Sequence, residues 1–187
     1  MTPNPDPLAA AVGRTIPDVT APGLRVLFCG INPGLVSGAL GQHFARPGNR
    51  FWKVLHAAGF TGRILLPSEQ EELLDFGIGI TNLVPTASRA AADLSAAELR
   101  AGALALQQKV AVLHPANVAI LGMQAYRTAF QRPAAVAGPQ PEPLAGARLW
   151  MLPNPSGLQA RYGFAEMVDM FERMRRAVDL AQPTTPP

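Results

Sequence analysis

Cysteine and charge are both scarce in this chain. Its 187 residues include one cysteine, Cys29, so no intramolecular disulfide can form, and zinc or iron–sulfur centres built from several cysteines are excluded. Charged residues make up 16%, against about 25% in an ordinary soluble domain. Together with 48% hydrophobic residues, this composition predicts a compact, well-buried fold with Cys29 packed in its core.

Long apolar runs are missing as well. No stretch approaches the roughly 18 uninterrupted apolar residues that a membrane-spanning helix needs. The N-terminal sequence MTPNPDPLAA also lacks the basic segment and apolar block of a secretion signal. We therefore expect a cytoplasmic protein that makes no membrane contact.

Lysine is nearly absent, although the chain is basic. Lys53 and Lys109 are the two lysines among 16 basic residues, which face 13 acidic ones and leave a net charge of +3. This balance is compatible with a polyanionic partner but does not require one. The planar, forked guanidinium of arginine suits phosphates and base edges. A GC-rich genome would produce the same preference for arginine over lysine.

The signatures of several common α/β enzymes are also lacking. The sequence Gly30-Ile-Asn-Pro-Gly has no middle glycine for a dinucleotide-binding G-x-G-x-x-G motif, and no Gly-Lys pair exists for a Walker loop. Ser156 does not stand in the G-x-S-x-G motif of a hydrolase nucleophile. The three histidines, His43, His56 and His114, lack the spacing of metal ligands.

Proline concentrates at the two ends of the chain. Eight of the nineteen prolines lie in residues 1–22 and 183–187. We expect residues 1–23 to be a flexible, Pro-rich segment, residues 24–180 a single domain, and residues 181–187 a disordered tail.

Short apolar segments alternate with helical patterns between these ends. Buried strands are predicted at 25–29, 79–84, 117–121 and 149–152. Helices are predicted at 51–58, from Ser68 and from Ser95 (both in capping-box form), at 123–130 and at 164–180, and 133–146 as a loop. This order predicts an α/β three-layer sandwich, with a short, mainly parallel sheet of about four strands and helices on both faces.

Two of the predicted strands end in the same way. FCGINPGLVS (28–37) and WMLPNPSGLQAR (150–161) both run from apolar residues into Asn-Pro, a strong chain break. Because ligands bind at the carboxyl ends of parallel strands, we expect both loops to face one site.

These two motifs, with HFARPGNRFW (43–52) between them, resemble the mismatch-specific uracil-DNA glycosylase family, which includes thymine-DNA glycosylase. The resemblance extends from about Leu24 to the last helix. It implies a monomeric DNA repair enzyme that flips uracil, and other mismatched or damaged pyrimidines, out of double-stranded DNA and hydrolyses the N-glycosidic bond. It implies no metal and no cofactor. Neither motif holds a lysine to form a Schiff base, so no strand cleavage is expected.

The resemblance assigns the catalytic role to Asn32, whose carboxamide would position the attacking water. An amide is a poor proton acceptor, so Asn32 would orient the water rather than deprotonate it, which predicts a slow enzyme. Without the second motif, we would interpret Asn32 as a turn residue whose side chain forms a hydrogen bond with its own backbone. Asp93 is a second candidate that would assist the water, against an alternative role as a solvated residue near a helix N-terminus.

The resemblance also implies a pocket for the flipped base. Phe44 would stack on the base, with burial in the core as its alternative, and Asn154 would either contact the pocket or shape the turn. The pocket residues that we expect are Gly30, Ile31, Gly34, Phe44, Asn82 and Asn154.

The second motif is expected to enter the duplex. Leu158 would fill the gap left by the flipped nucleotide, unless it turns into the core, and Gly157 would let the backbone approach DNA closely. Arg161 stands one position later than in the family pattern. The contact with the base on the opposite strand that the resemblance implies for this arginine would therefore be displaced, taken over by Gln159, or lost. The DNA-binding residues that we expect are Ser156, Gly157, Leu158, Gln159, Arg161, Arg46 and Arg50, with ordinary surface charge as the alternative for the last two.

Two rival functions remain at the level of the sequence. One is a catalytically weak protein that binds DNA lesions through the same pocket. The other is an α/β enzyme that acts on a small molecule.

Overall fold

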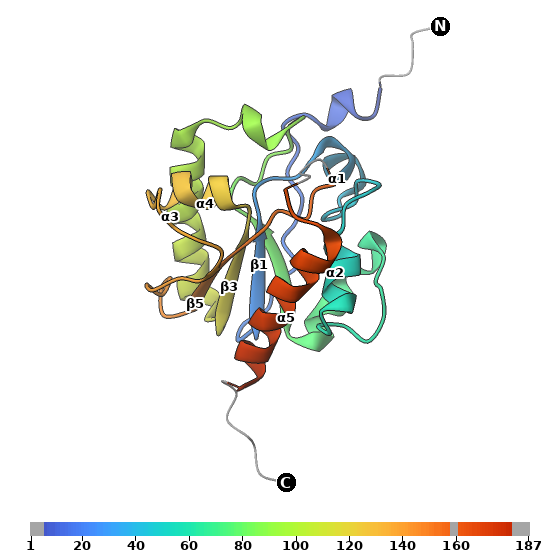
Figure 1. Ribbon diagram of the computed structural model, residues 1–187. Helices are drawn as coiled ribbons and strands as arrows, with labels where there is room; N and C mark the ends of the chain where they lie inside the picture. The colour runs from blue at the N-terminus through green and yellow to red at the C-terminus, as the bar shows by residue number, and fades with distance from the viewer. Residues whose placement is uncertain (1–5, 158–160, 181–187) are drawn as a thin grey trace, which may run out of the picture.

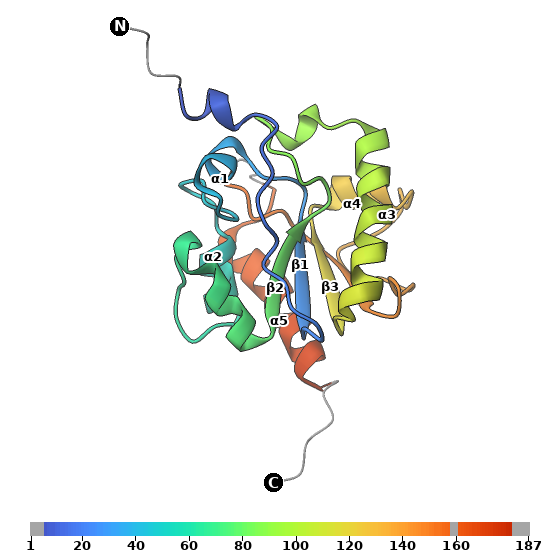
Figure 2. The ribbon, with the colours of Figure 1, turned by 180° about the vertical axis from the view of Figure 1, so that it is seen from behind.

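A five-stranded sheet of order β2-β1-β3-β5-β4 lies between two layers of helices (Figures 1 and 2). The computed structural model describes residues 6–157 and 161–180. The parallel strands are β1 (Val26–Gly30), β2 (Ile78–Asn82), β3 (Asn117–Leu121) and β5 (Arg148–Leu152). The predicted α/β class and mainly parallel sheet are therefore confirmed.

The fifth strand lies in the segment that we expected to be a loop. β4 (Gly138–Pro139) is two residues long and pairs antiparallel with β5 at the edge of the sheet. Because proline has no N–H to donate to a sheet, an edge is the position that Pro139 can occupy. A strand this short leaves no periodic pattern in the sequence.

All five predicted helices form, and three short ones that the sequence did not indicate join them in the described residues. They are η1 (Ala9–Ala11), α1 (Leu35–Leu40), α2 (Phe51–Ala57), η2 (Pro67–Phe76), η3 (Ala91–Asp93), α3 (Ala96–Leu113), α4 (Met123–Ala129) and α5 (Phe164–Leu180), where η marks a 3-10 helix. The predicted capping box at Ser95 is confirmed, since the Ser95 and Glu98 side chains each accept a hydrogen bond from the other residue's backbone N–H. None of the helices in the described residues combines the length and apolar composition needed to cross a membrane.

The capping box predicted at Ser68 is wrong. The chain forms a 3-10 helix that begins at Pro67, and Glu69 accepts a hydrogen bond of 2.7 Å from the backbone N–H of Leu66. Pro67 presets the backbone for the first helical position, which places the N-cap at Leu66 and the capping carboxylate three residues later.

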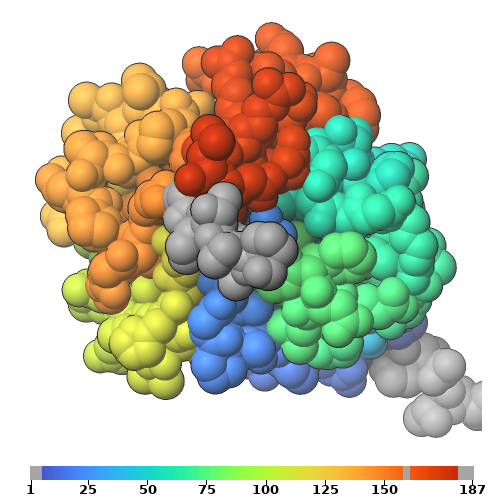
Figure 3. All heavy atoms as spheres, turned by 90° about the horizontal axis from the view of Figure 1, so that it is seen from below, coloured from blue at the N-terminus to red at the C-terminus, as the bar shows by residue number. Residues whose placement is uncertain are grey.

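Each face of the sheet carries its own core. Phe28 points to the side of α2 and α5, where its ring packs against Phe51 and Phe171 at centroid distances of 5.7 and 5.8 Å. Cys29 points to the side of α3 and α4 and is fully buried, as predicted, and burial raises the pKa of its thiol. The view from below shows α5 (red) and α3 (yellow-green) on opposite sides of the molecule (Figure 3).

The segment before residue 24 is not loosely attached over its described part. Val19 forms an antiparallel bridge with Ile80 of β2 and is 1% exposed, and Asp18 pairs with Lys109 of α3. Ile16 is also buried. Pro17 and Pro22 belong to an extended segment that runs along β2 (Figure 2), and Val19 between them reaches the core.

Candidate functional site

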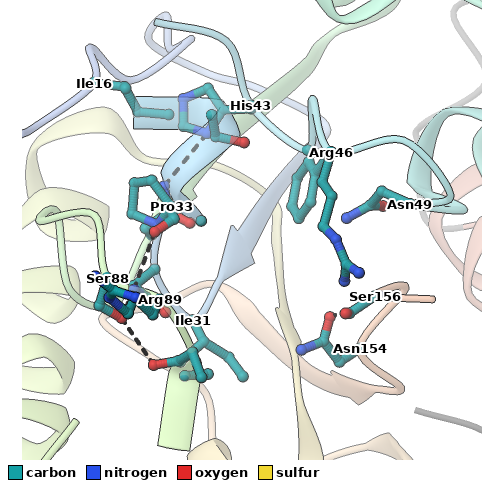
Figure 4. A pocket seen from close by; sticks show the side chains of 17 residues that line it. Ile16, Ile31, Pro33, His43, Arg46, Asn49, Ser88, Arg89, Asn154 and Ser156 are labelled. Carbon is teal, nitrogen blue, oxygen red and sulfur yellow. Dashed lines mark hydrogen bonds between the residues drawn. The ribbon is translucent and has the colours of Figure 1, made fainter. Parts of the chain in front are cut away.

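A cavity of about 130 Å³ lies where the loops after β1, β2 and β5 meet the N-terminal segment. Cavities of about 150 Å³ take up benzene, so this space has the scale of a single six-membered ring. Figure 4 shows Ile16 and His43 at one end of the cavity and Asn154 and Ser156 at the other. Of the predicted site residues, the following line it: Ile31, Asn32, Gly34, Phe44, Arg46, Asn82, Asn154 and Ser156. The two Asn-Pro loops therefore face one place, as their position at strand ends predicted.

The Asn32 carboxamide is held by its nitrogen. Its Nδ2 donates to the Ser88 hydroxyl at 2.8 Å and to the Pro33 carbonyl at 3.1 Å, and it lies 3.4 Å from the Thr86 carbonyl. Because all three groups accept hydrogen bonds, the amide can present only its nitrogen to them. No described residue donates a hydrogen bond to Asn32 Oδ1. The atom is also not among the buried polar atoms that lack a partner, so it is exposed, and it faces the cavity that Asn32 lines.

Ser88 is a site residue that sequence reasoning missed. Its hydroxyl accepts from Asn32, donates to the Ala90 carbonyl at 2.8 Å, and so fixes the Asn32 amide from the neighbouring loop. Its backbone N–H also donates to the Pro33 carbonyl, which joins the loops after β1 and β2. A lone serine in a loop gives no periodic or motif signal by which the sequence could have revealed it.

Phe44 adopts a backbone conformation that side chains rarely take, with a φ of 52°. One face of its ring stacks on Phe51 at a centroid distance of 4.0 Å, which leaves the opposite face for a ligand. Gly30 makes room beside it: a Cβ at this position would lie 2.5 Å from Asn82 Oδ1 and 3.3 Å from the Phe44 ring. Gly30 does not itself line the cavity but keeps its floor open.

His43 is a second residue that the sequence did not single out for the site. It is 1% exposed, its Nε2 lies 2.9 Å from the Pro17 carbonyl, and its Nδ1 lies 3.3 Å from Asn82 Nδ2. A carbonyl can only accept, so Nε2 carries the ring proton. Burial lowers the pKa of His43, which keeps the ring neutral.

The second motif forms a turn around Asn154. Its Oδ1 accepts a hydrogen bond from the backbone N–H of Ser156 at 3.0 Å, which shapes the turn. Asn154 also lines the cavity, so its position is compatible with both of the roles that the sequence left open.

Arg50 binds this loop rather than extending into solvent. Its backbone N–H donates to the Pro155 carbonyl at 3.0 Å and its guanidinium to the Tyr162 carbonyl at 2.9 Å.

Gly157 lies against the loop that follows Phe44. A Cβ at residue 157 would meet the Gly48 carbonyl oxygen at 2.6 Å. We expected glycine here because it would let the backbone approach DNA closely. The contact between two loops of the protein already requires a residue without a side chain at this position.

Asp93 and Arg161 lie outside the cavity wall. Asp93 is exposed, and its carboxylate accepts from the Ala90 N–H at 2.9 Å, which caps η3. Arg161 is exposed and lies over the Tyr162 ring at 5.8 Å, beside a second, adjacent cavity. Leu158 and Gln159 lie outside the described residues. In residues 6–157 and 161–180, no group of three or more His, Cys, Asp and Glu could hold a metal ion.

Two arginines stand at the mouth of the cavity. Arg46 points toward Asn154 and Ser156, and Arg89, which the sequence did not suggest, lies on the other side next to Ser88 (Figure 4). Both are exposed, and neither guanidinium makes an ion pair or hydrogen bond with the described residues. They leave positive charge on opposite sides of a ring-sized opening.

Comparisons with known proteins identify the fold and the superfamily of the chain. The solution NMR structure of a candidate uracil DNA glycosylase from Methanosarcina acetivorans has a similar fold, with a TM-score of 0.56 and 18% sequence identity over 88% of this chain and 99% of the other. At this identity the likeness supports the fold alone. The family model of the uracil DNA glycosylase superfamily matches residues 17–178, and because this match spans most of the sequence, the chain belongs to that superfamily.

Proposed function

We propose that the chain is a monofunctional DNA glycosylase that removes uracil from double-stranded DNA and leaves an abasic site. Superfamily membership implies a DNA substrate. The observation that carries the proposal is that both Asn-Pro loops line one ring-sized cavity, with the Asn32 carboxamide oxygen open to it. The mismatch-specific subclass rests on the motifs GINPG and NPSGL.

The cavity suits a flipped base in two respects. The free face of Phe44 offers a stacking surface, and stacking of a base on an aromatic ring is worth about 1–3 kcal/mol. Extrusion of the nucleotide costs a few kcal/mol, so this contact offsets part of the cost. Uracil is the proposed base, with other mismatched or damaged pyrimidines as further substrates.

Catalysis would depend on orientation rather than on proton abstraction. Asn32 Oδ1 can accept a hydrogen bond from a water molecule, but an amide does not remove its proton near neutral pH. The amide nitrogen is fixed by Ser88, so the oxygen points in one direction without further ordering. We infer a slow enzyme in which the bond from C1′ to the base breaks, the base departs as an anion, water adds to C1′, and the proton of that water passes to the departed base or to solvent.

One observation favours a second candidate, a weak catalyst that mainly binds lesions. None of the described residues that line the cavity is a carboxylate, and Asp93 is bound as a helix cap. A labelled duplex with one U·G pair, treated with protein and then with hot alkali, separates the two functions. An alkali-labile site supports the glycosylase, whereas gel retardation of the duplex without such a site supports the binder.

Substitution of Arg89 by glutamine is expected to weaken binding of all duplexes alike. If Arg89 contacts a phosphate, the slope of log affinity against log salt concentration falls by about 1. The measurement is a salt titration with duplexes of different sequence. Arg176, which pairs with Glu172 on α5 away from the cavity, provides the matched control R176Q, and an equal effect of both substitutions would contradict a phosphate contact.

Stability is expected to fall as the pH drops below about 6.5, the ordinary pKa of histidine. Burial has the largest influence on the pKa of His43 and lowers it, and the nearby charge of Lys109 also lowers it. The hydrogen bond to Pro17 and the charges of Asp18 and Glu71 raise the pKa, but by less. The unfolded chain then binds a proton that the folded chain does not, so acid favours unfolding until the pH passes the lowered pKa. Denaturant titrations at several pH values should show a smaller acid loss for H43N, and an equal loss would refute the assignment.

A further inference from the structure

The chain before β1 is bonded to the loop after β2 through its backbone. The Gly13 N–H donates to the Ala87 carbonyl at 2.8 Å, and the Ala87 N–H donates to the Arg14 carbonyl at 2.7 Å. Both backbone groups of Ala87 are thus held by one short segment. The next residue of that segment, Thr15, continues the pairing as an antiparallel bridge to Thr86.

Close packing adds a second contact between the segment and the loop. Ala11 is fully buried, and Gly38 of α1 faces both Ala11 and Ala87. A Cβ at Gly38 would lie 2.7 Å from Ala87 Cβ and 3.3 Å from the Ala11 carbonyl oxygen, so no space for a methyl group remains here. Figure 2 shows η1 (dark blue) beside α1, at the edge where the parallel strands end. The loop therefore has no room to move toward α1.

The two neighbours of Ala87 are the residues that hold Asn32. The Ser88 hydroxyl accepts from Asn32 Nδ2 at 2.8 Å, and the Thr86 carbonyl lies 3.4 Å from the same nitrogen. Because Ala87 stands between them in the chain, a displacement of Ala87 moves both groups at once. The Asn32 amide would then lose the contacts that keep its oxygen in one direction.

We propose that residues 11–14 are a positioning element, which holds Ala87 so that its two neighbours keep the Asn32 carboxamide oriented. This inference rests on the proposed function of the same site. A carboxamide that can rotate presents its oxygen to the water for only part of the time, which lowers the rate of excision and leaves the DNA-facing surface unchanged. The element precedes the part of the chain that the superfamily model matches, so superfamily membership assigns it no role.

The substitution A11D tests the element and has a matched control in the same short helix. An aspartate at this fully buried position displaces the segment from the loop, because an unpaired buried charge is costly. Ala10 is exposed, so A10D adds the same charge without that displacement. We expect A11D to slow single-turnover excision from a U·G duplex by about tenfold, and A10D by less than about twofold, with equal duplex affinities. Equal rates of the two variants would contradict the proposal.

A double-mutant cycle decides whether the element acts through Ser88. S88A removes the hydroxyl that the element keeps in place, so A11D should slow excision by about threefold or less in the S88A background instead of tenfold. A purely structural effect of A11D would be independent of Ser88 and would multiply with the effect of S88A. Equal factors in both backgrounds would therefore overturn the proposal.

G38A disturbs the loop from the opposite side and provides a second test if A11D does not fold. The added Cβ would push against Ala87, while alanine favours the helix α1 more than glycine does. We expect a slower rate than in the control G62A, and again a smaller factor in the S88A background. A G38A rate equal to that of G62A would show that Asn32 does not depend on the position of the loop.

A further readout does not depend on catalysis. Amide hydrogen exchange reports the protection of the Ala87 N–H, which is bonded to Arg14, and of the Ser88 N–H, which is bonded to Pro33. The proposal requires A11D to speed exchange at both amides while the amides of β3 keep their wild-type rates. Faster exchange at Ala87 alone would refute it, because the segment would then cover the loop without holding it. If the wild type removes no uracil, the proposed function fails, while the exchange rates still decide whether the segment holds the loop.

Discussion

Replacement of Asn32 by alanine is expected to slow uracil excision by about 100-fold or more, with duplex affinity close to that of the wild type. The side chain lies inside the cavity, so its loss removes the group that orients the water without changing the surface that faces the duplex. Single-turnover rates and gel retardation measure the two effects separately. If affinity and melting temperature fall in parallel with the rate, Asn32 has a structural role instead.

S88A provides the matched test of how Asn32 is held. Loss of the hydroxyl removes the 2.8 Å contact to Asn32 Nδ2 but leaves the Pro33 and Thr86 carbonyls in place. A loss of rate of up to about tenfold, smaller than that of N32A, is expected because one neutral hydrogen bond contributes about 0.5–1.5 kcal/mol. The carbonyls also explain why aspartate would fit poorly here, since a carboxylate would face acceptors without a proton to give them.

Replacement of Gly30 by alanine is expected to abolish most of the activity. The added Cβ would lie 2.5 Å from Asn82 Oδ1 and 3.3 Å from the Phe44 ring, so the carboxamide and the stacking surface must both move. The rate should fall by about 100-fold, and the overpacked site should lose about 1–3 kcal/mol of unfolding free energy.

G62A is the control for this substitution. A Cβ at Gly62 would meet no heavy atom within 4 Å, and its φ lies outside the positive region, so the methyl group should be tolerated. Rates and thermal melts of both variants test the prediction. Wild-type rates in G30A would show that the cavity floor can yield and that the ring does not bind there.

The sequence located the parts of the site that lie on strand ends. Asn32 and Asn154 stand in Asn-Pro turns after apolar runs, and such turns at the carboxyl ends of parallel strands must converge, so their meeting around one cavity could be predicted. The spacing of apolar residues predicted the four longer strands and five of the helices, whereas the short elements η1, α1, η3 and β4 have no such pattern. The capping box at Ser95 was also predictable, because its pattern is local.

The residues that hold these side chains could not be predicted in this way. Ser88 and His43 act through contacts with residues 56 and 39 positions away in sequence, and neither stands in a pattern that marks such a partner. Gly157 was noticed as a glycine, but the backbone that requires it, at Gly48, became evident only in three dimensions. Long-range pairs of this kind depend on how loops pack, which composition and spacing do not report.

The packed N-terminal segment sets a limit on how far the protein can be trimmed. A fragment starting at Leu24 would lose Ile16 from the cavity wall, the Pro17 carbonyl that anchors His43, and the bridge of Val19 to the outermost parallel strand. It would uncover the part of that strand that Val19 now covers and leave His43 Nε2 without its partner. Any minimal fragment designed for crystallisation with DNA should therefore begin upstream of Ala11, which is fully buried, and so keep Gly13, whose backbone N–H donates to the Ala87 carbonyl.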